Sequence, residues 1–210
     1  MAKTADIERE IETLAESARG VSYDGEHVWV ATGKQLVACD ADSGKRARTL
    51  DVAAEAGTAF DGKHLYQIGQ GAIQKLDPHS GQVLARIPLP SESDNSGLAW
   101  AEGSLWVGQM RGRKIVRIDP ESGRVLAEID SNRFVTGVSF CEGELWHATL
   151  ENEQSELRHV DRRSGAVLDS VTMPAGTAIH GLESNGKDRF FCGGGKGGKV
   201  RVVKRPRGAK

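Results

Sequence analysis

The chain has 210 residues, of which 38% are hydrophobic and 27% are charged, and its formal net charge is −1. This composition is typical of a soluble globular protein, and the near-neutral charge argues against a dedicated nucleic-acid-binding protein. No apolar stretch approaches the roughly 20 residues of a membrane helix, and the first residues do not resemble a secretory signal. We therefore expect a cytoplasmic protein with reduced cysteines that contacts neither membranes nor nucleic acid.

The first element in chain order, residues 7–16, stands outside the repeats that follow. Ile7, Ile11 and Leu14 follow a helical spacing, so periodicity alone favours a helix in this segment.

The rest of the chain repeats a glycine-led motif five times. The first glycines of the motifs are Gly20, Gly57, Gly97, Gly137 and Gly181. Each motif opens a block of roughly 40 residues with short apolar strands, which is typical of a β-propeller blade. We predict an all-β, single-domain, five-bladed propeller with four-stranded antiparallel blades. The predicted blades cover about residues 20–52, 57–90, 97–130, 137–173 and 181–204.

Four blocks contain the turn motif Asp-x-x-Ser-Gly, at residues 40–44, 77–81, 119–123 and 161–165. The Asp side chain can cap such a turn and the Gly can adopt positive φ, so the repetition favours a structural role for these acids. The fifth block lacks this turn and lacks a fourth strand. Because an unfilled blade leaves an exposed strand edge, we predict that part of residues 7–16 supplies the missing strand and closes the ring, even if some leading residues are helical.

The loops predict that the two faces of the propeller differ. The turns after the first and third strands are short and alike, and they form what we name the repeated-turn face. The other loops differ between blocks, as residues 91–97 and 149–156 do, and they form the diverse face. Binding residues concentrate on variable loops held by a rigid scaffold, so we expect a binding site on the diverse face.

The position after the second-strand aromatic varies between blocks. This slot holds Val30, Gln67, Val107 and His147, and in the fifth block either Phe191 or, less favoured, Cys192. Polar side chains in an otherwise apolar slot near the channel mouth indicate a site. The alternative is a histidine that only satisfies a backbone carbonyl between two blades.

His180 precedes the fifth glycine and is expected at the channel entrance. The equivalent residues of the other blocks are Arg19, Ala56, Ser96 and Thr136. Such a ring could hold a polar or anionic small molecule, because the fork-shaped guanidinium of Arg19 can bind a carboxylate. A channel lined only by polar groups and water is the alternative. The ligand-binding candidates are Arg19, Gln67, Asn95, Thr136, His147 and His180, and we expect both histidines on one rim.

Three residues are candidates for catalysis: His147, His180 and Cys192. A thiolate–imidazole pair could act as nucleophile and base, and neutral histidines could bind a divalent or soft metal ion. No CxxC pair or tight Cys/His cluster predicts a structural zinc site, so a divalent metal is the one cofactor left open.

Two blocks, GEHVWVATGKQLVACDADSGK and GKHLYQIGQGAIQKLDPHSGQVLARIPLP, resemble the five-bladed glutaminyl cyclotransferases of plants and bacteria. The resemblance extends over nearly the whole chain, implies the five-bladed fold, and includes the family's pattern at Leu65–Gln67. That family carries its catalytic Glu in a motif like YESTG, and Val30 stands at that position here. Valine cannot transfer a proton, so we expect no glutaminyl cyclisation. The segment IHGLES and the Asp-x-x-Ser-Gly turns are locally similar to the seven-bladed streptogramin lyases, which use His and Glu around Mg²⁺.

These observations favour a monomeric propeller that binds a small polar molecule or peptide on the diverse face and lacks cyclisation activity. Two alternatives stay open. One is a lyase or transferase that uses His147 and His180, with or without a metal. The other is a scaffold that binds a protein or peptide.

Overall fold

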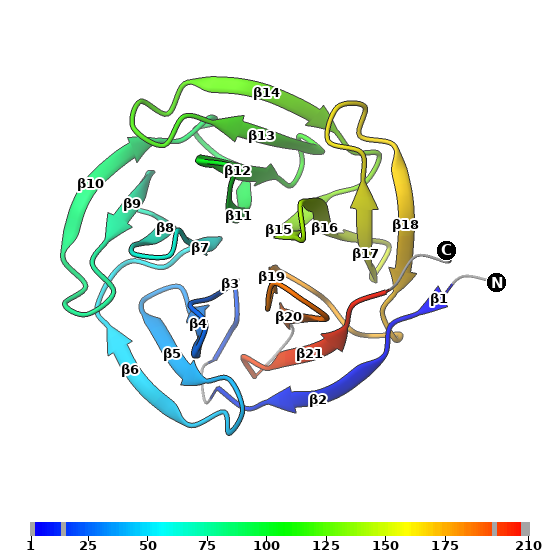
Figure 1. The fold of residues 1–210 in the computed structure, drawn as a ribbon, viewed down its shortest axis with the longest axis horizontal. Helices are drawn as coiled ribbons and strands as arrows, with labels where there is room; N and C mark the ends of the chain where they lie inside the picture. The colour runs from blue at the N-terminus through cyan, green and yellow to red at the C-terminus, as the bar shows by residue number, and fades with distance from the viewer. Residues whose placement is uncertain (1–2, 14–15, 195–196, 207–210) are drawn as a thin grey trace.

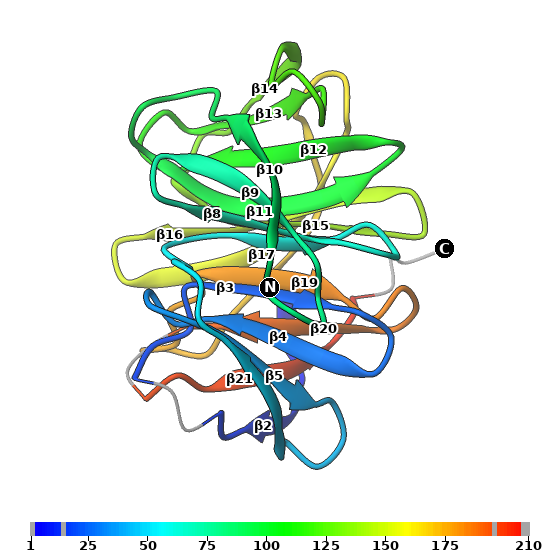
Figure 2. The ribbon, with the colours of Figure 1, turned by 90° about the vertical axis from the view of Figure 1, so that its left-hand side faces the viewer.

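The computed structural model describes residues 3–13, 16–194 and 197–206, and Leu14 lies outside these ranges. The described residues form β-strands and no helix, so the helical interpretation of Ile7 and Ile11 is wrong. The strands form five antiparallel blades around a central axis (Figure 1). Seen edge-on, the hairpin turns of the blades lie at two opposite faces (Figure 2). The all-β, five-bladed prediction is confirmed, and the described residues contain no helix that could cross a membrane.

Each blade runs from an inner strand at the axis to an outer strand at the rim. Blade one consists of β3 (Gly20–Tyr23), β4 (His27–Ala31), β5 (Leu36–Asp40) and β6 (Arg46–Leu50). Blade two consists of β7 (Thr58–Phe60), β8 (Leu65–Gly69), β9 (Ala72–Leu76) and β10 (Val83–Pro88). Blade three consists of β11 (Asn95–Ala101), β12 (Ser104–Gln109), β13 (Lys114–Ile118) and β14 (Val125–Asp130).

The last two blades incorporate the N-terminal segment. Blade four consists of β15 (Val135–Cys141), β16 (Glu144–Glu151), β17 (Gln154–Val160) and β18 (Val167–Thr172), with the two-residue β1 (Lys3–Thr4) added outside β18. Blade five consists of β19 (Gly181–Ser184), β20 (Arg189–Gly193), β21 (Val200–Lys204) and, as its outer strand, β2 (Ile7–Ile11).

The predicted closure of the ring is confirmed. Strand β2 pairs antiparallel with β21, with Ile7 opposite Val203 and Ile11 opposite Val200. Ile11 is buried against blades one and five. The N-terminal strand therefore forms backbone hydrogen bonds along the otherwise open edge of β21, and it contributes Ile11 to the core.

Strand β1 extends this closure to blade four, which the sequence did not predict. It pairs in parallel with β18, and the Ala5 N–H donates to the Thr172 carbonyl at 2.8 Å. At the equivalent end of β14, the turn glycine Gly165 packs against Ile129 and the Asp130 carbonyl. Residues 3–5 therefore take the place that an Asp-x-x-Ser-Gly turn holds one blade earlier.

The four Asp-x-x-Ser-Gly turns have the predicted conformation. In each, an Asp oxygen accepts bonds of 2.5–2.8 Å from the Ser backbone N–H and hydroxyl, and the Gly has φ of 72–74°. These bonds lower the pKa of all four carboxyls. The acids thus serve the turns.

The motif glycines form a ring where neighbouring inner strands meet. A Cβ placed on Gly20, Gly57, Gly97, Gly137 or Gly181 would lie 2.4–2.8 Å from atoms of the next blade. Real Cβ atoms do not approach other atoms so closely. The five inner strands can therefore surround the axis at this level only because each carries a glycine there.

The blades pack on one another through aromatic side chains of the second strands. Tyr66 stacks on Trp100 with ring centroids 5.3 Å apart, and Phe191 contacts Tyr23 at 5.1 Å. Because Phe191 occupies this aromatic column, Cys192 and not Phe191 holds the slot equivalent to His147. The register agrees, since Cys192 pairs with Leu182 as His147 pairs with Val138.

Candidate functional site

A pocket of about 360 Å³ lies at the mouth of the channel on the diverse face, and we name it the mouth pocket. It brings together all five residues of the predicted ring, namely Arg19, Ala56, Ser96, Thr136 and His180. Asn95 also lines it, together with Met110, which sequence reasoning missed because it lies in a loop without repeat character.

Arg19 presents an unpaired positive charge in this pocket. Its exposed guanidinium lies over Gly33, where an added Cβ would be 3.3 Å from the Cζ atom. Its side chain makes no hydrogen bond or ion pair within the described residues. Arg19 is therefore free to bind an anionic group with two parallel N–H donors.

Two further polar groups of the mouth pocket have no partner in the described part of the chain. Thr136 is 1% exposed, and its Oγ1 makes no hydrogen bond. Asn95 donates from Nδ2 to the Ser91 carbonyl at 2.7 Å, whereas its buried Oδ1 is unpaired. Buried polar atoms are normally hydrogen-bonded, so these two mark a place for a water molecule or a ligand.

His180 stands beside Arg19 at the exposed mouth. Its backbone N–H donates to the Gly193 carbonyl at 2.7 Å, which fixes the residue next to the glycine ring. Partial loss of hydration and the nearby Arg19 charge lower the pKa of His180. The imidazole is therefore neutral at pH 7 and can accept or donate a hydrogen bond.

Gln67 does not line the mouth pocket. It is 0% exposed, and its Nε2 donates to the carbonyls of Ala56, Gly57 and Ile68 at 2.8–3.2 Å. The amide thus holds the backbone behind the ring in place. Its Oε1 has no partner within the described residues.

The prediction that His147 and His180 share one rim is wrong. His147 lines a different pocket, of about 380 Å³, together with Arg158 and residues 130–132 at the end of blade three. We name it the interblade pocket, and none of its residues lines the mouth pocket. Alternation along β16 is the reason, because Trp146 packs on Phe190 of blade five and His147 therefore faces blade three. Burial and the Arg158 charge lower the pKa of His147 to about 3.

Cys192 is separated from both histidine pockets. It is 0% exposed and lies in an apolar cluster with Trp146, Leu182 and Phe190. Burial raises the pKa of its thiol, so the thiolate that nucleophilic chemistry needs does not form at neutral pH. The geometry therefore gives no thiolate–imidazole pair.

Within residues 3–13, 16–194 and 197–206, no group of three or more His, Cys, Asp or Glu side chains is arranged to hold a metal ion. Val30, which the resemblance to glutaminyl cyclotransferases sets at the position of their catalytic Glu, is 0% exposed in the apolar cluster between blades one and five. A buried valine offers no group for proton transfer at this position.

Glu183 is a further residue that the sequence analysis missed. It lies on inner strand β19, and its Oε1 accepts hydrogen bonds from the Ser139 hydroxyl and the Ser184 N–H, both at 2.7 Å. Loss of hydration raises the pKa of this carboxyl to about 7. The signal was present in the repeat, because the equivalent residues are small: Ser22, Ala59, Ala99 and Ser139.

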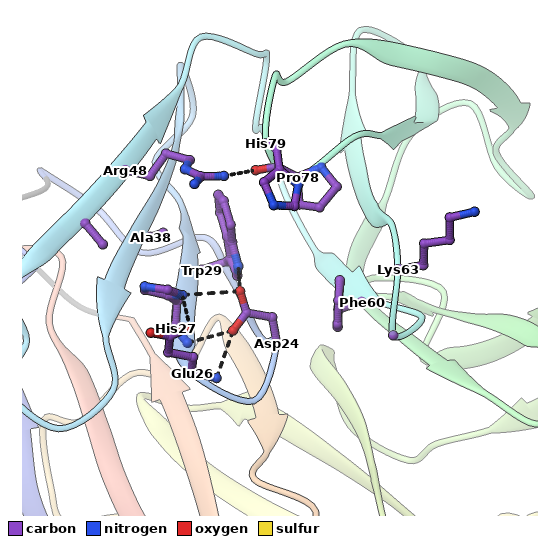
Figure 3. Close-up of a pocket in the computed structure, with 12 residues that line it drawn as sticks. Asp24, Glu26, His27, Trp29, Ala38, Arg48, Phe60, Lys63, Pro78 and His79 are labelled. Atoms are coloured by element: carbon purple, nitrogen blue, oxygen red, sulfur yellow. Dashed lines mark hydrogen bonds and ion pairs between the residues drawn. The ribbon is translucent and has the colours of Figure 1, made fainter.

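A hollow of about 480 Å³ opens between blades one and two on the repeated-turn face (Figure 3). Asp24 there accepts hydrogen bonds from Trp29 Nε1 at 2.7 Å and from the His27 backbone N–H at 2.6 Å. The equivalent Asp61 of blade two accepts from the Tyr66 hydroxyl and the His64 N–H in the same way. The recurrence indicates that Asp24 and His27 serve the turn.

The fold was compared with known proteins. No protein-family model and no curated protein sequence matches the chain. Among solved structures, the glutaminyl cyclase of Myxococcus xanthus is similar, with a TM-score of 0.75 and 18% identity over 96% of each chain. A catalytically inactive virginiamycin B lyase from Staphylococcus aureus has a TM-score of 0.55 and 15% identity, over 91% of this chain and 67% of the lyase. The Neurospora crassa Pan2 WD40 domain has a TM-score of 0.56 and 16% identity, over 84% of this chain and 56% of that one. At these identities the likeness is one of fold, and it agrees with the five-bladed propeller.

Proposed function

We propose that this propeller binds a small polar ligand carrying a carboxylate in the mouth pocket, and that it does not cyclise N-terminal glutamine. The observation that carries the proposal is the unpaired guanidinium of Arg19, which faces the same pocket as the neutral imidazole of His180. Arginine binds carboxylates with two aligned hydrogen bonds, and the partially enclosed mouth strengthens them.

The rest of the pocket can recognise the uncharged part of such a ligand. The unpaired Thr136 hydroxyl and Asn95 Oδ1 offer a donor and an acceptor. A larger groove of about 910 Å³ adjoins the mouth pocket and shares Ser17, Arg19 and Glu55 with it. This groove provides room for a peptide whose carboxylate end occupies the mouth.

The lack of cyclisation rests on Val30. The similar cyclase fold brings the same scaffold, but the side chain at the position of the family's catalytic acid is a buried valine. The alternative of an enzyme using both histidines receives no support from the geometry, since His147 and His180 line separate pockets.

The proposal includes a cytoplasmic monomer. All three cysteines are buried and unpaired, which agrees with a reducing compartment. Sedimentation of the purified chain at several concentrations tests the monomer, and a concentration-dependent mass would contradict it.

Calorimetric titration with a panel of small carboxylates, including free amino acids and succinate, tests the ligand class. We expect binding by the intact protein and roughly ten-fold or greater weakening in Arg19→Met, because a charge-assisted hydrogen bond is lost. Arg111→Met is the matched control, since Arg111 is an exposed arginine outside the mouth pocket. Equal affinity of the Arg19→Met and intact proteins would reject the mouth pocket as the site. Separately, a peptide with N-terminal glutamine should release no ammonia above the buffer rate.

A further inference from the structure

The interblade pocket lies at a position where blades one and three are apolar. In blades one and three, the slot residue and its partner on the third strand are both valine, as in Val30 with Val37 and Val107 with Val116. In blade four the same two positions are His147 and Arg158. His147 is 1% exposed and Arg158 is 6% exposed, so two polar side chains are buried where blades one and three use valines. Blade two also buries polar side chains there, Gln67 with Gln74, but these are uncharged amides.

Arg158 is the buried member of a charged network that reaches the surface. Its Nε donates to Glu156 Oε2 at 2.8 Å, and its Nη1 donates to Asn132 Oδ1 at 2.7 Å. Glu156 also pairs with the half-buried Arg133 at 3.0 Å. Two arginines and one glutamate leave a formal charge of +1 in this network. The Arg158 guanidinium is mostly kept out of water, so a further opposite charge beside it would be favourable.

Further hydrogen-bonding residues line the same pocket. The Nδ1 atom of His147 is buried and has no partner within the described residues. Ser131 also lines the pocket, and its Oγ accepts the Arg133 N–H at 3.2 Å, which leaves the hydroxyl proton free to donate. Asp130 lies on the rim, where its exposed side chain is screened by water.

We propose that the interblade pocket is a second binding site, for a small oxyanion that contacts the Arg158 guanidinium, the His147 imidazole and the Ser131 hydroxyl. The bound group is a phosphate or a carboxylate, since both accept aligned hydrogen bonds from a guanidinium and both neutralise the network. The site is independent of the proposed function of the mouth pocket and shares no residue with it.

The test follows the ring nitrogens of His147 by nuclear magnetic resonance. The protein carries Arg19→Met so that the mouth pocket does not respond, and inorganic phosphate or acetate is titrated at constant ionic strength against chloride. We expect saturable shifts of the His147 resonances with at least one of the two anions and none with chloride. Saturation by phosphate alone or by acetate alone identifies the group and supports the site in either case.

Three variants sharpen the test. Arg158→Gln, which keeps hydrogen-bonding capacity without charge, should weaken the binding roughly ten-fold or more. Glu156→Gln raises the formal charge of the network from +1 to +2 and should tighten it several-fold. Arg111→Gln, an exposed control, should leave it unchanged. The proposal is overturned if neither anion shifts the His147 resonances, if chloride does so equally, or if folded Arg158→Gln binds as tightly as its parent.

Discussion

Two histidine–arginine pairs occupy this propeller in opposite environments. His180 and Arg19 stand exposed at the channel mouth, where the guanidinium has no partner in the described residues. His147 and Arg158 are buried between blades three and four, where the guanidinium is bonded to Glu156 and Asn132. The chemistry of the two pairs is similar, but the surroundings differ.

The difference teaches that burial decides what each pair contributes. At the mouth, water hydrates the charges, so Arg19 costs little when no ligand is bound and can exchange ligands freely. Between the blades, the charges belong to the fold itself, and losing Arg158 removes a hydrogen bond from the partly buried Glu156. The predictions below test this contrast, beginning with the largest expected effect.

Both environments depend on the closed ring. Deleting residues 1–11 removes β1 and β2, and with them the buried Ile11, so we expect a loss of at least about 4 kcal/mol in the free energy of unfolding. Thermal unfolding followed by circular dichroism measures it. Deleting only residues 1–4, which removes β1 and keeps β2, should have a clearly smaller effect. A variant without residues 1–11 that melts like the intact protein would contradict the closure.

Removal of the two arginines should separate the pairs. Arg158→Met removes one of the two arginine partners of the partly buried Glu156, and we expect a loss of about 2 kcal/mol. Arg19→Met removes an exposed, unpaired side chain, and the expected change is within about 0.5 kcal/mol. Urea unfolding of both variants decides. Equal losses would mean that burial does not distinguish the two sites.

The pH dependence of stability should differ at His147. The pKa of His147 is about 3 in the folded protein and about 6.5 when unfolded, so the unfolded state binds the extra proton between these values. The stabilising effect of the neutral imidazole is complete above about pH 6.5 and is lost as the pH falls. Relative to His147→Val, the intact protein should lose about 1.4 kcal/mol per pH unit between roughly pH 6 and pH 4.

The control for this prediction is His180→Gln, measured over the same range. The pKa of the exposed His180 is also lowered, so its loss has the same sign, but its hydration keeps the slope smaller. Parallel stability curves for the intact protein and His147→Val would show that the imidazole charges without cost and lies in a wetter place than described.

The smallest effect concerns single hydroxyls. Thr136→Val should weaken carboxylate binding in the mouth pocket roughly three- to ten-fold, because a neutral hydrogen bond contributes about 0.5–1.5 kcal/mol. Thr149→Val is the matched control, since Thr149 is also buried with an unpaired Oγ1 but lies outside that pocket. Calorimetry with the tightest carboxylate of the panel measures both. An equal effect of the two variants would place the ligand elsewhere.

Much of this molecule was predictable from its repeats. Positions counted from the motif glycines are equivalent in every blade, so Arg19, Thr136 and His180 could be placed in one ring before any coordinates. The closing strand followed from a missing edge in the fifth block. Strand β1 did not, because two residues in parallel pairing leave no periodic pattern.

The placement of His147 failed for a different reason. Trp146 packs against blade five, and alternation along a strand then requires its neighbour to face the opposite blade, not the channel. Arg158 was missed because the sequence does not show how β16 and β17 are aligned. Only their pairing in the structure places Arg158 opposite His147. Glu183, in contrast, could have been identified from the sequence, because the equivalent positions of the other four repeats hold only Ser or Ala.

The pairing of β2 with β21 also constrains how the protein is made. Ile7 is translated before all five blades' repeats, but its partner Val203 is translated only after the four complete blades. Until then the buried face of β2 has nothing to cover it, and blades one and four lack a neighbour on one side. The ring can close only after synthesis of β21, so the nascent chain passes through a long stage with open strand edges, at which chaperone binding or mispairing with another nascent copy competes with folding.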